Sequence, residues 1–144
     1  MFGLKGKTML DKMQKISFSK IIQSKNYSAF ILRSGQKEFA IYTVPSTGLH
    51  IENILENSPR RPQTHTFIDT IFSGFDISIK KVLLTDIKDN IYYATILLSK
   101  KSGEMEDILE IDARPSDALL LALKHDTEVL CSQKVLDESP SYID

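Results

Sequence analysis

Three charged residues stand where an apolar run meets a proline, in the stretch LEIDARPSDALLL at residues 109–121. Alternate side chains of a strand share a face, so Asp112 and Arg114 would point the same way, with Asp117 in the first turn of a following helix. Two carboxylates there can hold a divalent cation that activates water for attack on phosphate, and Arg114 can clamp the phosphate. A purely structural explanation is that Asp117 complements the helix dipole and Arg114 pairs with a carboxylate.

A second candidate cluster is PRRPQTHTF at residues 59–67. Helix N-termini offer unpaired N–H groups to anions, and Arg60 and Arg61 would add bidentate phosphate donors. His65 could transfer a proton as general acid or base. The alternative is a proline-bounded linker before a capped helix.

A third cluster is LLTDIKDNIYYA at residues 83–94, where Asp86 lies near an expected hairpin turn. Polar residues are common at turns, but Asp86 could approach Asp112 across a sheet and is the third candidate metal ligand. Tyr92 and Tyr93 could stack bases in principle, although alternation inside an apolar strand places at least one of them in the core.

The remaining reactive side chains are interpreted as structural. Cys131 is the single cysteine, so it can form no internal disulfide, and its apolar neighbours favour a buried thiol. His50 and His125 lie in or near helix ends, without converging partners that the sequence can identify.

The elements that must position these residues form a pattern that occurs twice. Five strand-like runs alternate in hydrophobicity, and three segments have helical signals. The runs are YSAFILRS, EFAIYTV, KKVLLTDI, IYYATILLS and DILEIDA, and the helical segments are 46–56, 64–73 and 116–125. In the middle helix Phe67, Ile68, Ile71 and Phe72 form an apolar stripe, and Thr64 is placed to cap it.

Two segments of the chain match at an offset of 70, FAIYTVPSTGLHIENIL and LEIDARPSDALLLALKH, so that Pro45 aligns with Pro115. Upstream, Lys20 aligns with Lys81 at an offset of 61. We infer a duplicated strand-strand-strand-proline-helix unit. The predicted fold is α+β, with one or two mostly antiparallel sheets and about three helices. Residues 1–136 would form one domain and 137–144 a C-terminal tail, whose order the sequence leaves open.

The duplication separates features of the fold from features of function. The proline-serine pair that opens a helix occurs in both copies, which favours a structural role. The charged residues of the second copy do not recur in the first. At the offset of 70, Asp112, Arg114 and Asp117 align with Tyr42, Val44 and Thr47.

Charge is uneven along a chain whose net charge is only −1, which argues against binding nucleic acid by bulk electrostatics alone. Residues 1–37 hold eight Lys or Arg and one Asp, whereas residues 101–144 hold four Lys or Arg and eleven Asp or Glu. These ends could complement each other within the fold or between subunits, or the basic end could bind phosphates. No apolar run is long enough for a bilayer and no signal peptide is evident, so we expect a cytoplasmic protein without membrane contact.

RRPQTHTF, LTDIKDNIYYATI and above all LEIDARPSDALLLAL, in this order and at these separations, resemble the bifunctional nuclease domain family. The resemblance runs from about residue 15 to residue 136. It implies a small α+β domain associated with hydrolysis of RNA and DNA, and self-association. The motif positions that carry over are Arg61, Pro62, Thr64, His65, Asp86, Asp89, Asp112, Arg114, Pro115, Ser116 and Asp117.

The leading hypothesis is an enzyme, a nuclease (RNase, DNase or both) of weak sequence specificity. Asp112, Asp117 and His65 would be catalytic, Arg114 and Arg61 would bind phosphate, and Asp112, Asp117 and Asp86 would hold Mg²⁺ or Mn²⁺. The partners would be nucleic acid and further copies of the chain. The alternative is a non-catalytic binding or regulatory module that docks a partner or a small anion at the Asp112, Arg114 and Asp117 corner.

Overall fold

The computed structural model describes residues 10, 12–56 and 63–143, and their fold is α+β, as predicted. The elements in chain order are β1 (Gln14–Gln23), β2 (Ser28–Ser34), β3 (Lys37–Thr43), α2 (Pro45–Glu56), α3 (Thr64–Gly74), β4 (Ile77–Lys88), β5 (Ile91–Ser102), β6 (Met105–Ala113), α4 (Pro115–His125), β7 (Val129–Cys131) and α5 (Gln133–Glu138). Over these ranges no helix combines the length and apolar character needed to cross a membrane.

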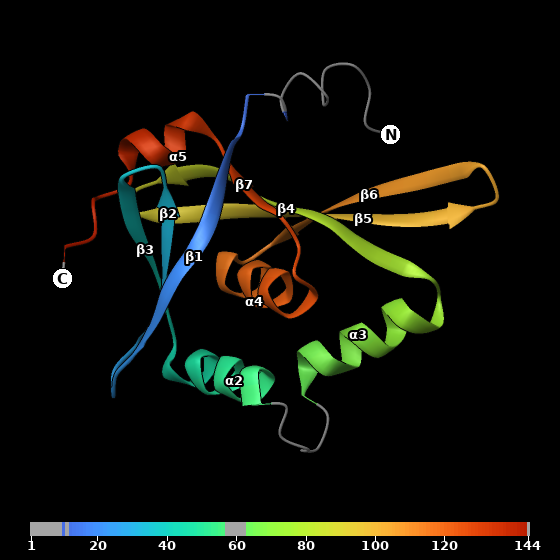
Figure 1. The fold of residues 1–144 in the computed structure, drawn as a ribbon, viewed down its shortest axis with the longest axis horizontal. Coiled ribbons are helices and arrows are strands. Elements are labelled where there is room, and N and C mark those ends of the chain that lie inside the picture. Colours follow the sequence, from blue (N-terminus) through green and yellow to red (C-terminus); the bar gives the residue numbers. More distant parts are fainter. Residues whose placement is uncertain (1–9, 11, 57–62, 144) are drawn as a thin grey trace.

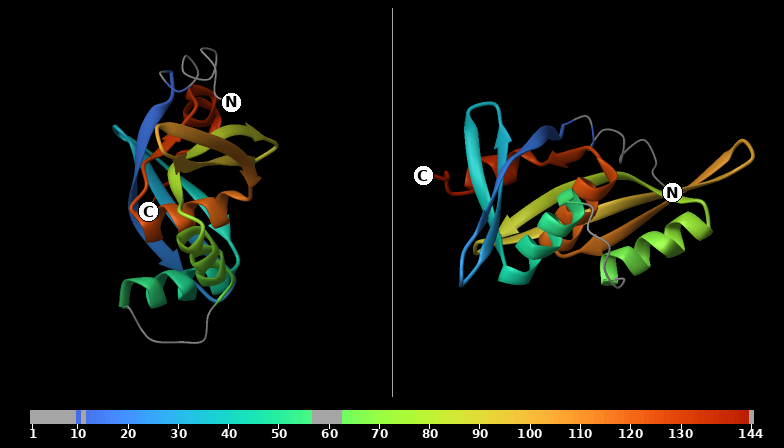
Figure 2. Two further views of the ribbon diagram at one scale, coloured as in Figure 1. Left: turned by 90° about the vertical axis from the view of Figure 1, so that its right-hand side faces the viewer. Right: turned by 60° about the horizontal axis from the view of Figure 1, so that its bottom comes forward.

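One seven-stranded sheet has the order β3-β2-β1-β7-β4-β5-β6. Its strand pairs are antiparallel except for β4 with β7. The sheet is strongly coiled, so β1–β3 cross the direction of β4–β6 (Figure 1). Helices α2, α3 and α4 lie on one side of it, and α5 lies on the other side near one end (Figures 1 and 2).

The predicted duplication is confirmed by the order of the elements and by an irregularity that both copies share. The unit β1-β2-β3-α2 recurs as β4-β5-β6-α4. The register of β1 against β2 shifts between Phe18 and Lys20, and the register of β4 against β5 shifts between Ile79 and Lys81. These positions match at the offset of 61, so the bulge belongs to the repeated unit. The hairpin turn expected near Asp86 is present, with positive φ at Asp89 and Asn90, and the other two hairpin turns have positive φ at Gly35 and Gly103.

Helix α4 occupies the centre of the core. Its residues Ala118 to Ala122 are consecutive and all buried, with Leu119 at 0 % exposure, which is the pattern of a helix covered on every side. The sheet covers it from above, and α2 and α3 lie beneath it (Figure 2). The chain entering α4 is therefore held from several directions at once.

Two features of the middle helix differ from the prediction. Thr64 is the first residue of α3 and not its cap, and the side chain of the N-cap residue, Gln63, makes no capping hydrogen bond. Phe67 is 62 % exposed and Ile71 is 40 % exposed, so only the Ile68 and Phe72 side of the predicted stripe faces the molecule. The reason is that α3 lies at the outside of the helical layer and packs along one edge only.

Strand β7 and helix α5 were not anticipated. The predicted domain boundary at residue 136 falls inside α5, which begins at a cap where Ser132 Oγ accepts from the Val135 N–H and extends to Glu138. Beyond it, the Ser139 carbonyl accepts from Lys37 Nζ at 2.7 Å, and the Tyr142 N–H donates to the Glu38 carbonyl at 2.8 Å. The C-terminal residues are therefore docked on β3 as far as they are described.

Replacing Gly48 with alanine should destabilise the fold, although alanine is the better helix former by about 1 kcal/mol. A Cβ at this position would lie 2.5 Å from Ser28 Oγ, which donates to the Pro45 carbonyl at 3.0 Å and accepts from the Gly48 N–H at 3.2 Å. We expect a loss of about 1–3 kcal/mol in the free energy of unfolding, measured by urea titration. In a Ser28→Ala background the loss should be smaller, and a neutral Gly48→Ala in the unaltered chain would contradict this close approach.

The thiol of Cys131 should be inert in the folded protein. Cys131 lies in the central strand β7 at 0 % exposure, and burial raises the pKa of its thiol to about 12. A thiol reagent at neutral pH should therefore react only as fast as the fold opens, and at its full rate in denaturant. Stoichiometric labelling within seconds under native conditions would show that β7 is not held as described.

Candidate active-site cleft

A cleft of about 560 Å³ lies where the end of β6 meets the starts of three helices. It is lined by Val44, Ser46, Thr47 and His50 at the start of α2, by Thr64, His65, Ile68 and Phe72 of α3, by Ile96 of β5, by Ile111, Asp112 and Ala113 of β6, and by Arg114, Asp117, Leu120 and Leu121 at and within α4. The structure thus brings Asp112, Arg114, Asp117 and His65 to one cleft. Segments from both halves of the chain form its walls.

The helix starts give this cleft an electrostatic preference for anions. The first N–H groups of a helix have no partner within it, and the helix dipole adds partial positive charge at the same end. The N-cap residues of α3 and α4, Gln63 and Arg114, make no side-chain capping bond. Among the described residues, neither N-cap side chain takes up these backbone donors beside the cleft, an arrangement that suits a phosphate.

Where β6 leads into α4, two charged side chains form an ion pair and a third, a carboxylate, is free among the described residues. Arg114 donates to both oxygens of Asp117, from Nε at 2.9 Å and from Nη2 at 3.3 Å, and this pair raises the pKa of the Arg114 guanidinium. Both side chains stay accessible, at 80 % and 53 % exposure. Within residues 10, 12–56 and 63–143 no hydrogen bond or ion pair engages the Asp112 carboxylate. Asp112 is thus available to a ligand, while Asp117 holds the arginine.

His65 is the buried titratable group of the cleft, at 9 % exposure. Its ring lies against the ring of His50 from α2, with centroids 5.6 Å apart and a tilt of 46°. Burial lowers the pKa of His65, and the nearby Lys124 and His50 lower it further, while Asp69 opposes them. The neutral imidazole is therefore favoured at neutral pH, and this is the form that can accept a proton.

An ion-pair cluster behind the cleft fixes α3 against α4. Asp69, one turn after His65, pairs with Lys124 and lies 2.6 Å from His125 Nε2 at the end of α4. The Asp69 side chain is only 16 % exposed, so solvent screens the contacts less than on an open surface. His125, interpreted from the sequence as structural, is placed in this cluster and outside the cleft lining.

Asp86, a predicted metal ligand, lies outside the cleft. The carboxylate of Asp86 accepts from Lys134 Nζ of α5 at 2.6 Å and from the Ile87 N–H at 2.8 Å, and the Lys134 bond is the main cause of its lowered pKa. Arg61 lies outside the described residues, as does Arg60.

The cleft residues do not form a complete metal site by themselves. In the part of the chain that the structure describes, no group of three or more His, Cys, Asp or Glu side chains is arranged to hold a metal ion. Asp117 is engaged by Arg114, and Asp86 by Lys134, which leaves Asp112 as the free candidate ligand.

His50, which the sequence indicated as a structural residue, lines the cleft. The repeat register contains the signal that identifies it, because positions matched at the offset of 70 line the same cleft. Val44 matches Arg114, Thr47 matches Asp117, and His50 matches Leu120. His50 follows Thr47 by one helical turn and so shares its face.

The stability of the protein should fall below pH 6.5 partly because of His65. Its folded-state pKa is lowered from 6.5, so its stabilising contribution is complete above that pH and is lost as the pH falls through the folded value. Urea titrations at neutral and mildly acidic pH should therefore show a smaller decrease in the free energy of unfolding for His65→Gln than for the unaltered chain. Equal decreases would mean that His65 is not held in a neutral, desolvated state.

Comparisons with known proteins agree with these observations. The family model of the bifunctional nuclease domain matches residues 30–144, which include every described wall of the cleft. Two Mycobacterium tuberculosis proteins, from strains CDC 1551 and H37Rv and both named only as uncharacterized, are each 25% identical over 105 residues. The aligned part covers 73% of this chain and 55% of each relative, so the chain spans about half their length. With the family model covering most of the sequence, the chain belongs to the bifunctional nuclease domain family.

Proposed function

We propose that this domain hydrolyses phosphodiester bonds of RNA or DNA in the cleft, with weak sequence specificity. One observation carries the proposal: a desolvated imidazole, His65, stands in the same cleft as uncapped helix starts and an accessible guanidinium, Arg114. These groups supply proton transfer and anion binding, which are the two requirements of phosphate ester hydrolysis. Membership of the bifunctional nuclease domain family supports the same assignment.

In the proposed reaction the phosphate lies against the helix starts, and Arg114 neutralises charge on its non-bridging oxygens. A ring nitrogen of His65 accepts a proton from water as the water oxygen attacks phosphorus. The bond from phosphorus to the leaving oxygen breaks, and the leaving alkoxide is protonated from solvent or from the imidazolium. Contacts to phosphate carry no information about the bases, which accounts for weak sequence specificity.

We also propose that Mg²⁺ or Mn²⁺ acts only together with the substrate. Mg²⁺ in proteins is commonly held by one or two carboxylates and by oxygens of the substrate phosphate. Asp112 is the free carboxylate in the cleft, and Asp117 would join it on leaving Arg114. A bound cation would polarise a phosphate oxygen, and the steps assigned above to His65 and Arg114 do not depend on it.

Self-association and a cytoplasmic location, which the sequence also suggests, stay predictions.

The test is cleavage of end-labelled single-stranded RNA and DNA by the purified chain, in Mg²⁺, in Mn²⁺ and in chelator. We expect His65→Gln to lower the rate by about 10²-fold or more, because it removes proton transfer. Arg114→Ala should lower it by about 10²-fold, because it removes a charged donor from the transition state. Asp112→Asn should lower the rate measured in metal more than the rate measured in chelator.

Asp107→Asn is the matched control, because Asp107 is an exposed carboxylate on the same strand β6 and lies outside the cleft. Its rate should equal that of the unaltered chain. Activity that persists in His65→Gln and Arg114→Ala would exclude the cleft as its source. Binding of the oligonucleotides without cleavage under every condition would favour the alternative, a non-catalytic module that docks an anion at this corner.

A further inference from the structure

A second hollow adjoins the cleft and contains aromatic side chains that the proposed reaction does not use. This tyrosine groove, of about 500 Å³, is lined by Ile41, Tyr42, Asn90, Ile91, Tyr92, Tyr93, Asp112, Ala113, Arg114, Pro115 and Ser116. Asp112, Ala113 and Arg114 line the cleft as well. The end of β6 is therefore a ridge with the cleft on one side and the groove on the other.

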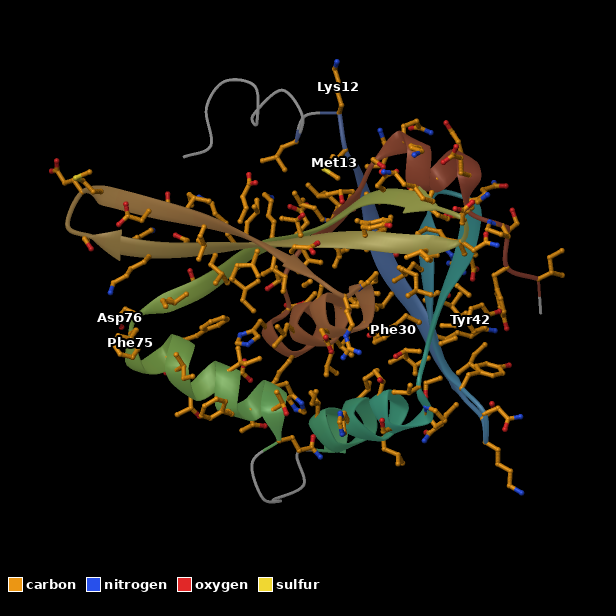
Figure 3. All side chains as sticks on the ribbon, turned by 180° about the vertical axis from the view of Figure 1, so that it is seen from behind. Lys12, Met13, Phe30, Tyr42, Phe75 and Asp76 are labelled. Atoms are coloured by element: carbon orange, nitrogen blue, oxygen red, sulfur yellow. The ribbon has the colours of Figure 1, made fainter. Side chains whose placement is uncertain are left out.

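The tyrosines of the groove differ in how far their rings are packed into the fold or exposed. Tyr92 is committed to the fold, because its ring stacks on Phe39 at 6.1 Å and its hydroxyl donates to Ser139 Oγ at 3.0 Å. Tyr42 is 62 % exposed and Tyr93 is 41 % exposed. Tyr42 projects from β3, the edge strand of the sheet, as Figure 3 shows. Tyr92 thus forms a fixed floor, and the other two present aromatic surface to a ligand.

The exposed rings are held in place although they are accessible. Tyr27 packs edge-on against Tyr42, with ring centroids 5.3 Å apart. Lys88 Nζ lies 5.8 Å from the ring centroid of Tyr93. Ordered aromatic faces lose little conformational entropy when a ligand stacks on them.

Two accessible cations lie beside the groove. Lys88 stands beside Tyr93, and Arg114 on the ridge is 80 % exposed. Asp112 is the carboxylate among the lining residues, and it lies on the ridge. Lys88 pairs with Asp86 at 3.6 Å and Arg114 with Asp117, but both cations stay accessible, at 64 % and 80 % exposure. A ligand with flat neutral parts and a negative backbone can therefore reach them beside the aromatic faces.

We propose that the tyrosine groove binds the unpaired bases of a single-stranded nucleic acid, while the phosphate next to them reaches Arg114 on the ridge. The inference rests on the proposed function, since the same strand would present its scissile bond to the cleft. It adds a substrate class, because bases that are paired in a duplex cannot stack on Tyr42 or Tyr93 without being unstacked first. Stacking is tolerant of base identity, so it is compatible with weak sequence specificity.

The test measures binding separately from cleavage, by fluorescence anisotropy of a labelled single-stranded oligonucleotide in chelator. We expect Tyr93→Ala and Tyr42→Ala each to weaken binding on the order of tenfold, and Tyr93→Phe and Tyr42→Phe to change it little, because phenylalanine keeps the stacking face. The unaltered chain should bind an abasic oligonucleotide of the same length more weakly than the normal one. For the abasic oligonucleotide, the alanine variants and the unaltered chain should have the same affinity. Duplex of the same sequence should bind more weakly than the single strand.

Phe67→Ala is the matched control, because Phe67 is an aromatic side chain that is 62 % exposed, like Tyr42, and lines neither the groove nor the cleft. It should leave affinity unchanged. Equal affinity of both tyrosine-to-alanine variants and the unaltered chain, or equal affinity for abasic and normal strands, would overturn the proposal even if the protein cleaves. Base-dependent binding without any cleavage would instead support the groove and reject the proposed hydrolysis.

Discussion

The fold depends on the pairing of a three-residue strand, β7, with two strands at once. Val129, Leu130 and Cys131 pair with Ile16, Lys15 and Gln14 of β1 on one side and with Val82, Leu83 and Leu84 of β4 on the other. Glu128 precedes this strand and pairs with both Lys15 and Lys81, one from each neighbour, and these lysines lower the pKa of its carboxyl. Without β7 the two meanders would expose unpaired edges in the middle of the sheet. The C-terminal segment therefore closes a structure that the duplicated units alone leave open.

Joining the two copies in this way sets their helix starts face to face. Each meander ends at a proline that opens a helix, and α2 and α4 contact each other below the sheet. Matched positions of the two copies then line one cleft, as Thr47 and Asp117 do. The side chains of the two copies can differ while the backbone keeps the same path, because the shared proline and bulge fix that path. Charge occurs on one side of the cleft and His50 on the other, which is an asymmetry that a symmetric scaffold permits.

The sequence was most informative where local physical rules act. Alternation, turn residues and the proline-serine register predicted both meanders and the helices after them, because these depend on neighbours in the chain. Strand β7 was missed because three apolar residues carry no periodicity, and their pairing is decided by β1, more than a hundred residues away. The exposure of Phe67 was missed for a related reason, since periodicity identifies an apolar face but not what covers it. The contact of His50 with His65 was missed because it depends on how α2 and α3 pack, although the repeat register places His50 opposite Leu120 in the alignment.

The charge of the cleft lining bears on how the proposed anionic ligand would bind. Apart from its histidines, the charged residues that line the cleft in the part of the chain that the structure describes are Arg114, Asp112 and Asp117, with a net charge of −1. Each helix start contributes about half a positive charge, so three of them outweigh the side chains and leave a net charge of only about +0.5. In the proposed reaction a phosphate would therefore be attracted only weakly to the cleft, and salt would weaken the attraction further. Stacking on the exposed tyrosines is insensitive to this balance, because it acts through apolar contact. In the proposed function, stacking would hold the nucleic acid strand while its phosphate occupies the cleft, which attracts the phosphate only weakly.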